Sequence, residues 1–454
     1  MSRPEERLLI LACLEPLAVE EAGEFAAIAS DPGLDWGLVG ALAALNKVEP
    51  RLSRVLRLRD LWDRVPEAAA AALAGVAEQV GATNGLRVLR AVEVLSAFRE
   101  ANIPVCVLKG VLFAETLYGD PAYKRMNDVD MLVHPEDASK IIAIYEGLGY
   151  FSIAERVAKR PDLNRRVSHH LPPYASRTLD CLLGTQWGLR SPRAGLKIDY
   201  AAIWGRVEPF DYHGVPARKM SSRDNLFHVC VHLGVFKSGL RDLMDIANLI
   251  RQESERIDWA AFIADVQVSG AQSLVVHALT MVQCIDPRPD TRAVLDALMP
   301  DARGFYLAAA ARKARSVAVL LRICSGHLST VEKNVSAFNV AGYFPQKASL
   351  FVAFWRSVLA APTPDRDRIC FEPAPTRGQA ARARIVAPVQ ILRAIGAEVG
   401  SGLVAALLVK SVVDLAVSFV RWPFVPRSRD DLDAYARSLG LTLADLKRVE
   451  DAIY

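Results

Sequence analysis

Residues 103–133 read IPVCVLKGVLFAETLYGDPAYKRMNDVDMLV and hold two short apolar runs, separated by a helix-like segment and a polar loop. The first run, residues 105–108, is β-branched and aliphatic, and it ends at Lys109 and Gly110. Glycine after a strand permits a sharp turn, so this order predicts a strand that turns into a helix over residues 111–118.

The second apolar run, residues 128–133, has a period of two. Side chains two residues apart on a strand share a face and lie roughly 6.5–7 Å apart along it. Asp128 and Asp130 are therefore expected on one face, with Val129 and Met131 in the core. Two carboxylates on one face repel unless a cation lies between them, and Mg²⁺ prefers oxygen ligands. The pattern predicts Asp128 and Asp130 as metal ligands, and the simpler alternative is a pair of solvated carboxylates at a strand end.

Positive groups lie near this acidic pair in the chain. The helix that opens at Gly110 offers free N–H groups and a positive dipole end, which suit a phosphate. Lys109 and Arg125 add charge of the right sign. A phosphate-binding turn beside a metal-binding carboxylate pair is what phosphoryl or nucleotidyl transfer requires, so Lys109, Gly110 and Arg125 are predicted nucleotide-binding residues.

Three motifs in this order, L-K-G, L-Y-x-D-P and R-x-x-D-V-D-M-L-V, resemble the uncharacterised bacterial branch of the nucleotidyltransferases of the DNA polymerase β superfamily. The resemblance covers roughly residues 5–395. It implies that Asp128 and Asp130 are catalytic and hold one or two Mg²⁺ ions. It also implies transfer of a nucleoside monophosphate from a nucleoside triphosphate, such as ATP, to an unknown acceptor, with release of pyrophosphate.

A third acidic residue is expected on a later strand in this family. Residues 179–190, LDCLLGTQWGLR, resemble that strand, on which relatives carry an acid, an apolar residue, His and Trp. At the four matching positions this chain has Gly184, Thr185, Gln186 and Trp187.

Gly184 thus replaces the third carboxylate. Asp180 would share its strand face if the strand extended that far, so Asp180 is the candidate replacement and a predicted catalytic residue. Mg²⁺ tolerates few protein ligands because water and substrate phosphates complete its shell. Two interpretations follow: an active nucleotidyltransferase, or a degenerate, catalytically weak nucleotide-binding or interaction protein.

Four histidines are candidates for contact with a substrate or a metal ion. Adjacent histidines on a strand face opposite sides, so at most one of His169 and His170 is expected at the site. Relatives have similar histidines here, which makes both candidates for substrate contact, and histidine can orient or deprotonate an acceptor. His228 and His232 have i,i+4 spacing, but without a third ligand a packed helix is the favoured interpretation.

The remaining sequence predicts an α+β protein in which a small mixed β-sheet core is embedded in a predominantly α-helical chain. The expected regions are an N-terminal helical region at 1–84, a catalytic core at 85–218, a helical domain at 219–395 with a Pro-rich loop at 361–377, and a C-terminal helical extension at 396–454. In the third region, Asp245 is expected to pair with Arg241 at i,i+4 rather than to reach the site.

Composition limits the partners. A net charge of +4 in 454 residues is too mild to indicate a nucleic-acid interface. The 7 cysteines are scattered without a C-x-x-C pair, so neither a disulfide framework nor a zinc site is indicated, and a reducing cytoplasm is expected. The expected partners are a nucleoside triphosphate and an unidentified small-molecule or protein acceptor.

Residues 403–424 are strongly apolar. Lys410, Asp414 and Arg421 interrupt them, and the uninterrupted pieces are shorter than the ~20 residues that a membrane span needs. The segment is expected to be a buried or interfacial helix, and peripheral contact with a membrane through it is a further expectation.

Overall fold

The computed structural model describes residues 2–152, 168–190 except 177 and 179, 196–233, 239–302 and 401–421, with residues 307, 310–311, 313–322, 348, 351–352 and 393 between them. Two compact units emerge. The described residues up to Ala310, together with residues 314–322, form the first, and helix α21 (Ser401–Arg421) belongs to the second. Helices predominate and surround one mixed sheet, which confirms the predicted α+β class.

The chain begins with a group of helices that bury their apolar faces against one another. They are α1 (Pro4–Cys13), α2 (Val19–Ala29), α3 (Trp36–Asn46), α4 (Glu49–Leu58) and the short η1 (Trp62–Arg64). Helix α1 is the centre of this group, since residues 8–13 are at most 1% exposed.

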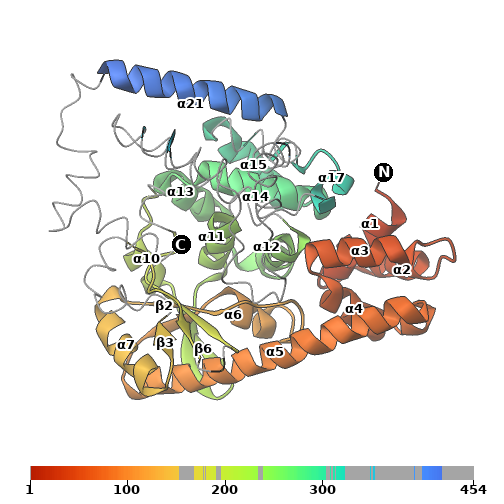
Figure 1. The fold of residues 1–454 in the computed structure, drawn as a ribbon, viewed down its shortest axis with the longest axis horizontal. Coiled ribbons are helices and arrows are strands. Elements are labelled where there is room, and N and C mark those ends of the chain that lie inside the picture. The colour runs from red at the N-terminus through yellow and green to blue at the C-terminus, as the bar shows by residue number, and fades with distance from the viewer. Residues whose placement is uncertain are drawn as a thin grey trace, which may run out of the picture. The chain divides into compact units, whose positions relative to one another are not determined.

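Helix α5 (Glu67–Glu100) is a single helix of 34 residues that runs along the sheet (Figure 1). The helix expected over residues 85–101 is its second half. Its first half is rich in alanine, which has the highest helix propensity and carries the helix back to Glu67. The expected region boundary after residue 84 therefore lies inside α5, and the boundaries after 84 and 218 both lie inside the first compact unit.

The sheet has seven strands in the order β3-β4-β5-β2-β1-β7-β6. The elements in chain order are β1 (Val105–Val107), α6 (Lys109–Thr116), β2 (Val129–Val133), η2 (Pro135–Asp137), α7 (Ala138–Gly147), β3 (Phe151–Ser152), β4 (Tyr174–Ala175), β5 (Leu182–Gln186), α10 (Tyr200–Gly205), β6 (Glu208–Tyr212) and β7 (Val215–Lys219). The pairs β2–β5 and β1–β7 are parallel, and the other neighbours are antiparallel. The central β2 thus lies between β1 and β5.

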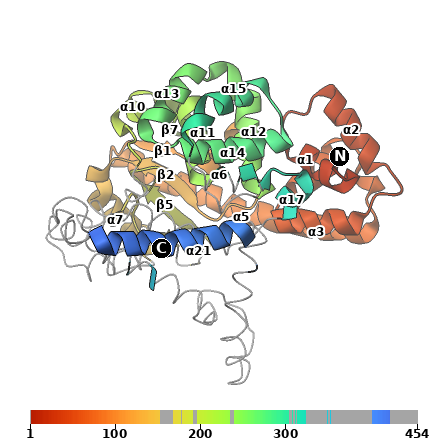
Figure 2. The same cartoon turned by 90° about the horizontal axis from the view of Figure 1, so that it is seen from above.

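A helical group follows the sheet. It comprises α11 (Ser222–Leu233), α12 (Leu240–Glu253), η4 (Ser254–Arg256), α13 (Trp259–Ser269), α14 (Gln272–Ile285), α15 (Pro289–Leu298), η5 (Met299–Asp301) and α17 (Val317–Arg322). Helices α11, α12 and α14 pack on one another, and α17 contacts α3 of the N-terminal group. Seen from above in Figure 2, the N-terminal helices lie beside this group.

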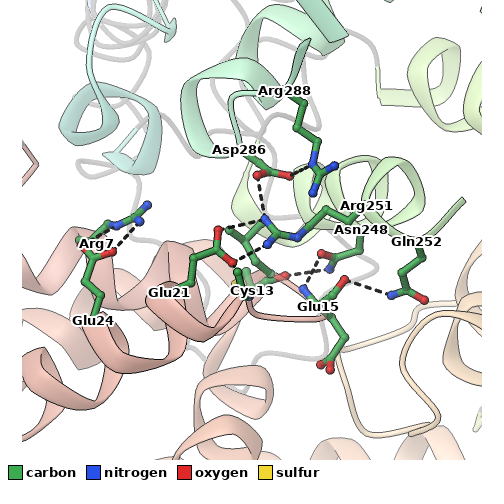
Figure 3. Close-up of polar contacts among 12 residues, drawn as sticks. Arg7, Cys13, Glu15, Glu21, Glu24, Asn248, Arg251, Gln252, Asp286 and Arg288 are labelled. Atoms are coloured by element: carbon green, nitrogen blue, oxygen red, sulfur yellow. Dashed lines mark hydrogen bonds and ion pairs between the residues drawn. The ribbon is translucent and has the colours of Figure 1, made fainter. Parts of the chain in front are cut away.

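Polar contacts fasten the N-terminal helices to α12. Figure 3 shows the guanidinium of Arg251 between Glu21 of α2 and Asp286, which follows α14. The Arg251 side chain is only 5% exposed. Arg288 also binds Asp286, at 3.1 Å. The N-terminal region is therefore part of the same folded unit as the sheet.

Helix α21 presents an apolar side to solvent. Val409, Val413, Val417 and Val420 recur at helical spacing and are 43–68% exposed. Among the described residues, no helix is both long and apolar enough to cross a membrane. The Pro-rich loop expected at 361–377 and most of the extension expected at 396–454, apart from residues 401–421, lie outside the described residues.

Candidate functional site

The turn between β1 and α6 places Lys109 at the C-terminal end of β1, a strand inside the sheet. Lys109, and not Gly110, has the left-handed backbone conformation, with a φ of +35°. A non-glycine residue there costs about 1 kcal/mol or more. Helix α6 accordingly begins at Lys109, two residues earlier than expected. Glycine at position 110 serves close packing instead, because a β-carbon would lie 3.2 Å from the Met126 sulfur.

Asp130 of strand β2 and Asp128, which precedes the strand, both lie on the side of Gly184. Val129 and Met131 are fully buried on the other face, as the period of two predicts. In the parallel pairing with β5, Asp130 lies directly beside Gly184. A β-carbon on Gly184 would lie 2.6 Å from Oδ1 of Asp130 and 3.7 Å from Oδ2 of Asp128. Both carboxylates therefore converge on the position that the sequence comparison assigns to the missing third acid.

Lys109 forms an ion pair with one of these carboxylates. Its Nζ lies 2.8 Å from Oδ2 of Asp130, and both side chains are more than four-fifths buried. The same Nζ lies 3.2 Å from Nε2 of His232 on α11. His232 therefore belongs to the site. The i,i+4 histidine spacing pointed to its helix face but not to this contact, which joins residues far apart in the chain.

The loop before β2 is held from α5 by Asn84, which is fully buried. The Asn84 side-chain amide donates to the carbonyls of Pro121 and Lys124, both at 2.7 Å. Its Oδ1 accepts from the backbone N–H of Met126 at 3.3 Å. Tyr123 adds a second tie, since its hydroxyl donates to the Gly110 carbonyl at 3.2 Å. One buried amide thus fixes the segment that leads into Asp128.

Asp245 of α12, a buried carboxylate, holds the same loop. It forms an ion pair with Lys124, and Tyr118 donates to its Oδ1 at 3.1 Å. The expected pairing with Arg241 is wrong, because Arg241 binds its neighbour Asp242 at 3.1 Å instead. The face of α12 that carries Asp245 is buried, and on this face Asp245 pairs with Lys124 of the loop rather than with Arg241.

Asp180 lies outside strand β5, which begins at Leu182. Its carboxylate accepts a hydrogen bond from the Ser176 hydroxyl at 2.5 Å and pairs with Arg90 at 3.4 Å. Burial opposes its ionisation, but the hydrogen bonds from Ser176, Thr178 and Arg90 together hold the pKa of Asp180 below its ordinary value. The strand is too short to give Asp180 the face of Gly184 by alternation.

His169 and His170 do not face opposite sides. Their rings meet edge to face with centroids 4.4 Å apart, since neither residue lies within a continuous strand and His170 makes only an isolated bridge to Gln186. Burial lowers the pKa of both, and the Asp130 charge counteracts this at His170. The Nδ1 of His170 lies 2.7 Å from the Leu171 carbonyl, which fits an Nδ1–H donor and leaves Nε2 basic in the neutral ring.

Two arginines complete the surroundings. Arg87 of α5 is half-buried, and burial lowers its pKa while the charges of Asp128 and Asp180 raise it. No pattern in the sequence pointed to Arg87. Arg125 is exposed, and its charge acts on Glu49 at the start of α4, whose pKa is raised by burial. The role of Arg125 in nucleotide binding stays a prediction.

Metal binding at this site rests on the aspartate pair. Within the described ranges, no group of three or more His, Cys, Asp or Glu side chains is placed to hold a metal ion. Two carboxylates that converge on one point suit a hard cation such as Mg²⁺, which takes its other ligands from water and phosphate. The donor set therefore fits a cation that arrives with a nucleotide.

Comparison with known proteins identifies the family of the chain. No curated protein and no solved structure matches the chain significantly. A family model described as uncharacterised nucleotidyltransferase matches residues 32–285, a segment that contains every site residue described above. The match covers more than half of the chain, and the protein therefore belongs to this nucleotidyltransferase family.

Proposed function

We propose that the protein transfers a nucleoside monophosphate from a nucleoside triphosphate to a hydroxyl or amine acceptor. The observation that carries this proposal is the convergence of Asp128 and Asp130 beside Gly184, with the ammonium of Lys109 at 2.8 Å from Asp130. Acidic and basic groups this close form a site for a metal-bound triphosphate, because the carboxylates take the cation and the lysine takes phosphate charge.

Each side chain then has a role. Asp128 and Asp130 hold Mg²⁺, which when bound offsets the charge of the triphosphate. Lys109 and the backbone of Gly110 at the start of α6 hold phosphate oxygens, and Arg125 approaches from solvent. The acceptor attacks the α-phosphorus, the bond to the bridging oxygen breaks, and pyrophosphate leaves.

His170 is the group we propose to receive the acceptor's proton. Its Nδ1 is directed to the Leu171 carbonyl, so Nε2 is the basic nitrogen of the neutral ring. Burial lowers the pKa of His170 and favours the neutral ring, which can accept a proton, and the charge of Asp130 partly offsets this effect. His169, in contact with His170, is proposed to bind substrate beside it.

The test is pyrophosphate release from ATP, GTP, CTP and UTP with Mg²⁺ and a panel of small-molecule, peptide and protein acceptors. The double substitution Asp128→Asn with Asp130→Asn should abolish release. Asp199→Asn is the matched control, because Asp199 caps α10 by accepting from the Ala202 N–H at 2.9 Å and asparagine caps equally well. Unchanged release in the double variant would refute the assignment.

A second candidate function is nucleotide binding without transfer. Gly184 replaces the third carboxylate, and Lys109 already neutralises Asp130. This candidate predicts saturable triphosphate binding by calorimetry, lost in Asp130→Ala, with no pyrophosphate from any acceptor. Measurable release with one acceptor would exclude it.

A separate proposal concerns α21, whose exposed valines we propose to contact an anionic lipid surface. Lys410, Asp414 and Arg421 share one arc of this helix, which adjoins the arc of the exposed valines, so the helix is amphipathic. Arg421, the last residue of α21, is followed in the sequence by Trp422, so an aromatic residue stands beside a basic one, as in interfacial helices. Full-length protein should float with anionic vesicles, and Val413→Ser with Val420→Ser should weaken flotation. Equal flotation of both proteins would refute the proposal.

A further inference from the structure

Gln186 of strand β5 has a buried side-chain amide without a protein partner. The residue is 8% exposed, and among the residues that the structure describes none accepts a hydrogen bond from its Nε2. Buried polar groups are almost always hydrogen-bonded in folded proteins, because an unpaired buried donor costs free energy. A ligand that offers an oxygen to this N–H2 group would remove that cost.

The strand register places Gln186 on the face of the sheet that carries Asp130. Gly184 lies beside Asp130, and Gln186 lies two residues further along β5, so the alternation of the strand puts it on the same face as Gly184. Thr185, between them, points to the opposite face, where its hydroxyl forms a hydrogen bond with Tyr145 of α7. The amide of Gln186 therefore belongs to the face of the candidate site and not to the core beneath α7.

His170 lies next to Gln186 on this face. The two residues form an isolated antiparallel bridge, and residues paired directly across neighbouring strands share a face. His170 and Gly184 are both partly exposed, so a substrate can approach the amide between them. Gln186 thus borders the place where His170, the proposed proton acceptor, meets its substrate.

The hydrogen-bonding groups at this place suit a hydroxyl better than an amine. A hydroxyl has one proton and two lone pairs. His170 can take the proton, and one lone pair can accept from the Gln186 amide while the other attacks phosphorus. A neutral amine has a single lone pair, which the attack uses, so an amine would leave the buried donor of Gln186 unpaired.

We infer that Gln186 is an acceptor-binding residue, whose side-chain amide donates a hydrogen bond to the hydroxyl oxygen that attacks the nucleotide. This inference rests on the proposed function. The acceptor oxygen forms a bond to the α-phosphorus, and its proton moves to Nε2 of His170. The bond from the α-phosphorus to the bridging oxygen breaks, and its electron pair leaves with pyrophosphate.

The linkage that the full-length protein forms tests the chemistry of the acceptor. Nucleoside triphosphates labelled at the α-phosphate are incubated with Mg²⁺ and matched acceptors, namely diols against diamines of equal length and peptides that carry Ser or Lys at one position. Transfer to a hydroxyl gives a phosphodiester that survives mild acid, whereas transfer to an amine gives a phosphoramidate that mild acid cleaves. Label mainly in the acid-stable product supports the inference. Label equally or mainly in the acid-labile product overturns it and leaves the proposed function standing, and no label in any acceptor overturns both.

Substitution of Gln186 separates acceptor binding from nucleotide binding. Gln186→Leu removes the donor at similar volume, so KM for the hydroxyl acceptor should rise by about tenfold or more, with KM for the nucleotide unchanged. Gln186→His restores an N–H donor and should recover affinity for the acceptor. Gln79→Leu, at an exposed position on α5, is the matched control and should equal the wild type.

Thermal melts verify that these variants are folded. A wild-type KM for the acceptor in Gln186→Leu would overturn the role of Gln186. An equal rise in both KM values would overturn it too, because that result marks a structural role.

Discussion

Gly184 lies beside Asp130 in the parallel pairing of β5 with β2, and a β-carbon on it would come within 2.6 Å of Asp130 Oδ1. Real atoms do not approach so closely, so any side chain at position 184 must displace the Asp130 carboxylate. The glycine is therefore more than a lost acid, because the present position of Asp130 depends on it.

The first prediction is that Gly184→Ala reduces nucleotide-dependent Mn²⁺ binding at least tenfold, since Asp130 must turn away. Isothermal calorimetry measures the loss. Gly85→Ala on α5 is the control, because nothing lies within 4 Å of a β-carbon there, and alanine should stabilise the helix by up to about 1 kcal/mol. Wild-type Mn²⁺ affinity in Gly184→Ala would show that Asp130 is not a ligand in its present position.

A second prediction concerns Asn84, whose amide holds the loop before β2. Asn84→Ala leaves the carbonyls of Pro121 and Lys124 without this buried donor and should lower the free energy of unfolding by about 1–3 kcal/mol. Nucleotide affinity should fall with it, because the loop positions Asp128. Urea denaturation and calorimetry measure the two effects.

The control for Asn84 is its neighbour. Thr83 donates only to the Gln79 carbonyl one turn earlier in α5, at 2.7 Å, so Thr83→Ala should change neither stability nor affinity appreciably. A stable Asn84→Ala variant with wild-type nucleotide affinity would contradict the proposed role of the loop.

Local periodicity was sufficient to predict the acidic pair. The alternation from Asp128 to Val133 fixes which side chains share a face, and the buried Val129 and Met131 confirm it. The resemblance also placed the third acidic position at Gly184, and the strand register brings that residue beside Asp130. These features depend on neighbouring residues and on one strand pairing.

Contacts between distant segments were not predictable in this way. Lys109 meets His232 from 123 positions away, and Asn84 meets its loop from 37 to 42 positions away. The spacing of apolar residues along a helix shows which face of the helix is buried, but it does not show which other element covers that face. Asp245 is an example. Its expected partner was Arg241, one turn away on the same helix, but in the folded protein it forms an ion pair with the buried Lys124 of the loop before β2.

The third prediction is a pH dependence carried by Asp180. Its native pKa lies below the ordinary value of 3.8, so the native state binds fewer protons than the unfolded state around that pH. The contribution of ionised Asp180 to the free energy of unfolding is therefore complete above pH 3.8, and it is lost as the pH falls through the native pKa. Asp180→Asn should be less stable than the wild type at pH 7, by on the order of 1 kcal/mol, and equally stable at the lowest pH.

The same variant tests whether Asp180 takes part in transfer. Its partners Ser176 and Arg90 give it a structural role in the segment before β5. We therefore expect Asp180→Asn to retain pyrophosphate release at pH 7, in contrast to the double variant at Asp128 and Asp130. A loss of release as large as in that double variant would instead assign Asp180 to the catalytic group.

The fourth prediction compares two arginines that fasten N-terminal helices (Figure 3). Arg251 is 5% exposed between Glu21 and Asp286, whereas Arg7 is 30% exposed beside Glu24. Removing one partner of a buried ion pair leaves an uncompensated charge, so Arg251→Met should cost about 3 kcal/mol. Arg7→Met should cost about 1 kcal/mol or less, because water solvates Glu24 once its partner is gone.

Urea denaturation of both arginine variants measures the difference. Arg251 joins α2 to α12, and α12 holds the loop before β2 through Asp245. The Arg251 variant should therefore also have a lower nucleotide affinity. Equal stability losses in the two variants would show that burial does not set the strength of these pairs. A destabilised Arg251 variant with unchanged nucleotide affinity would show that this ion pair does not set the position of the loop before β2.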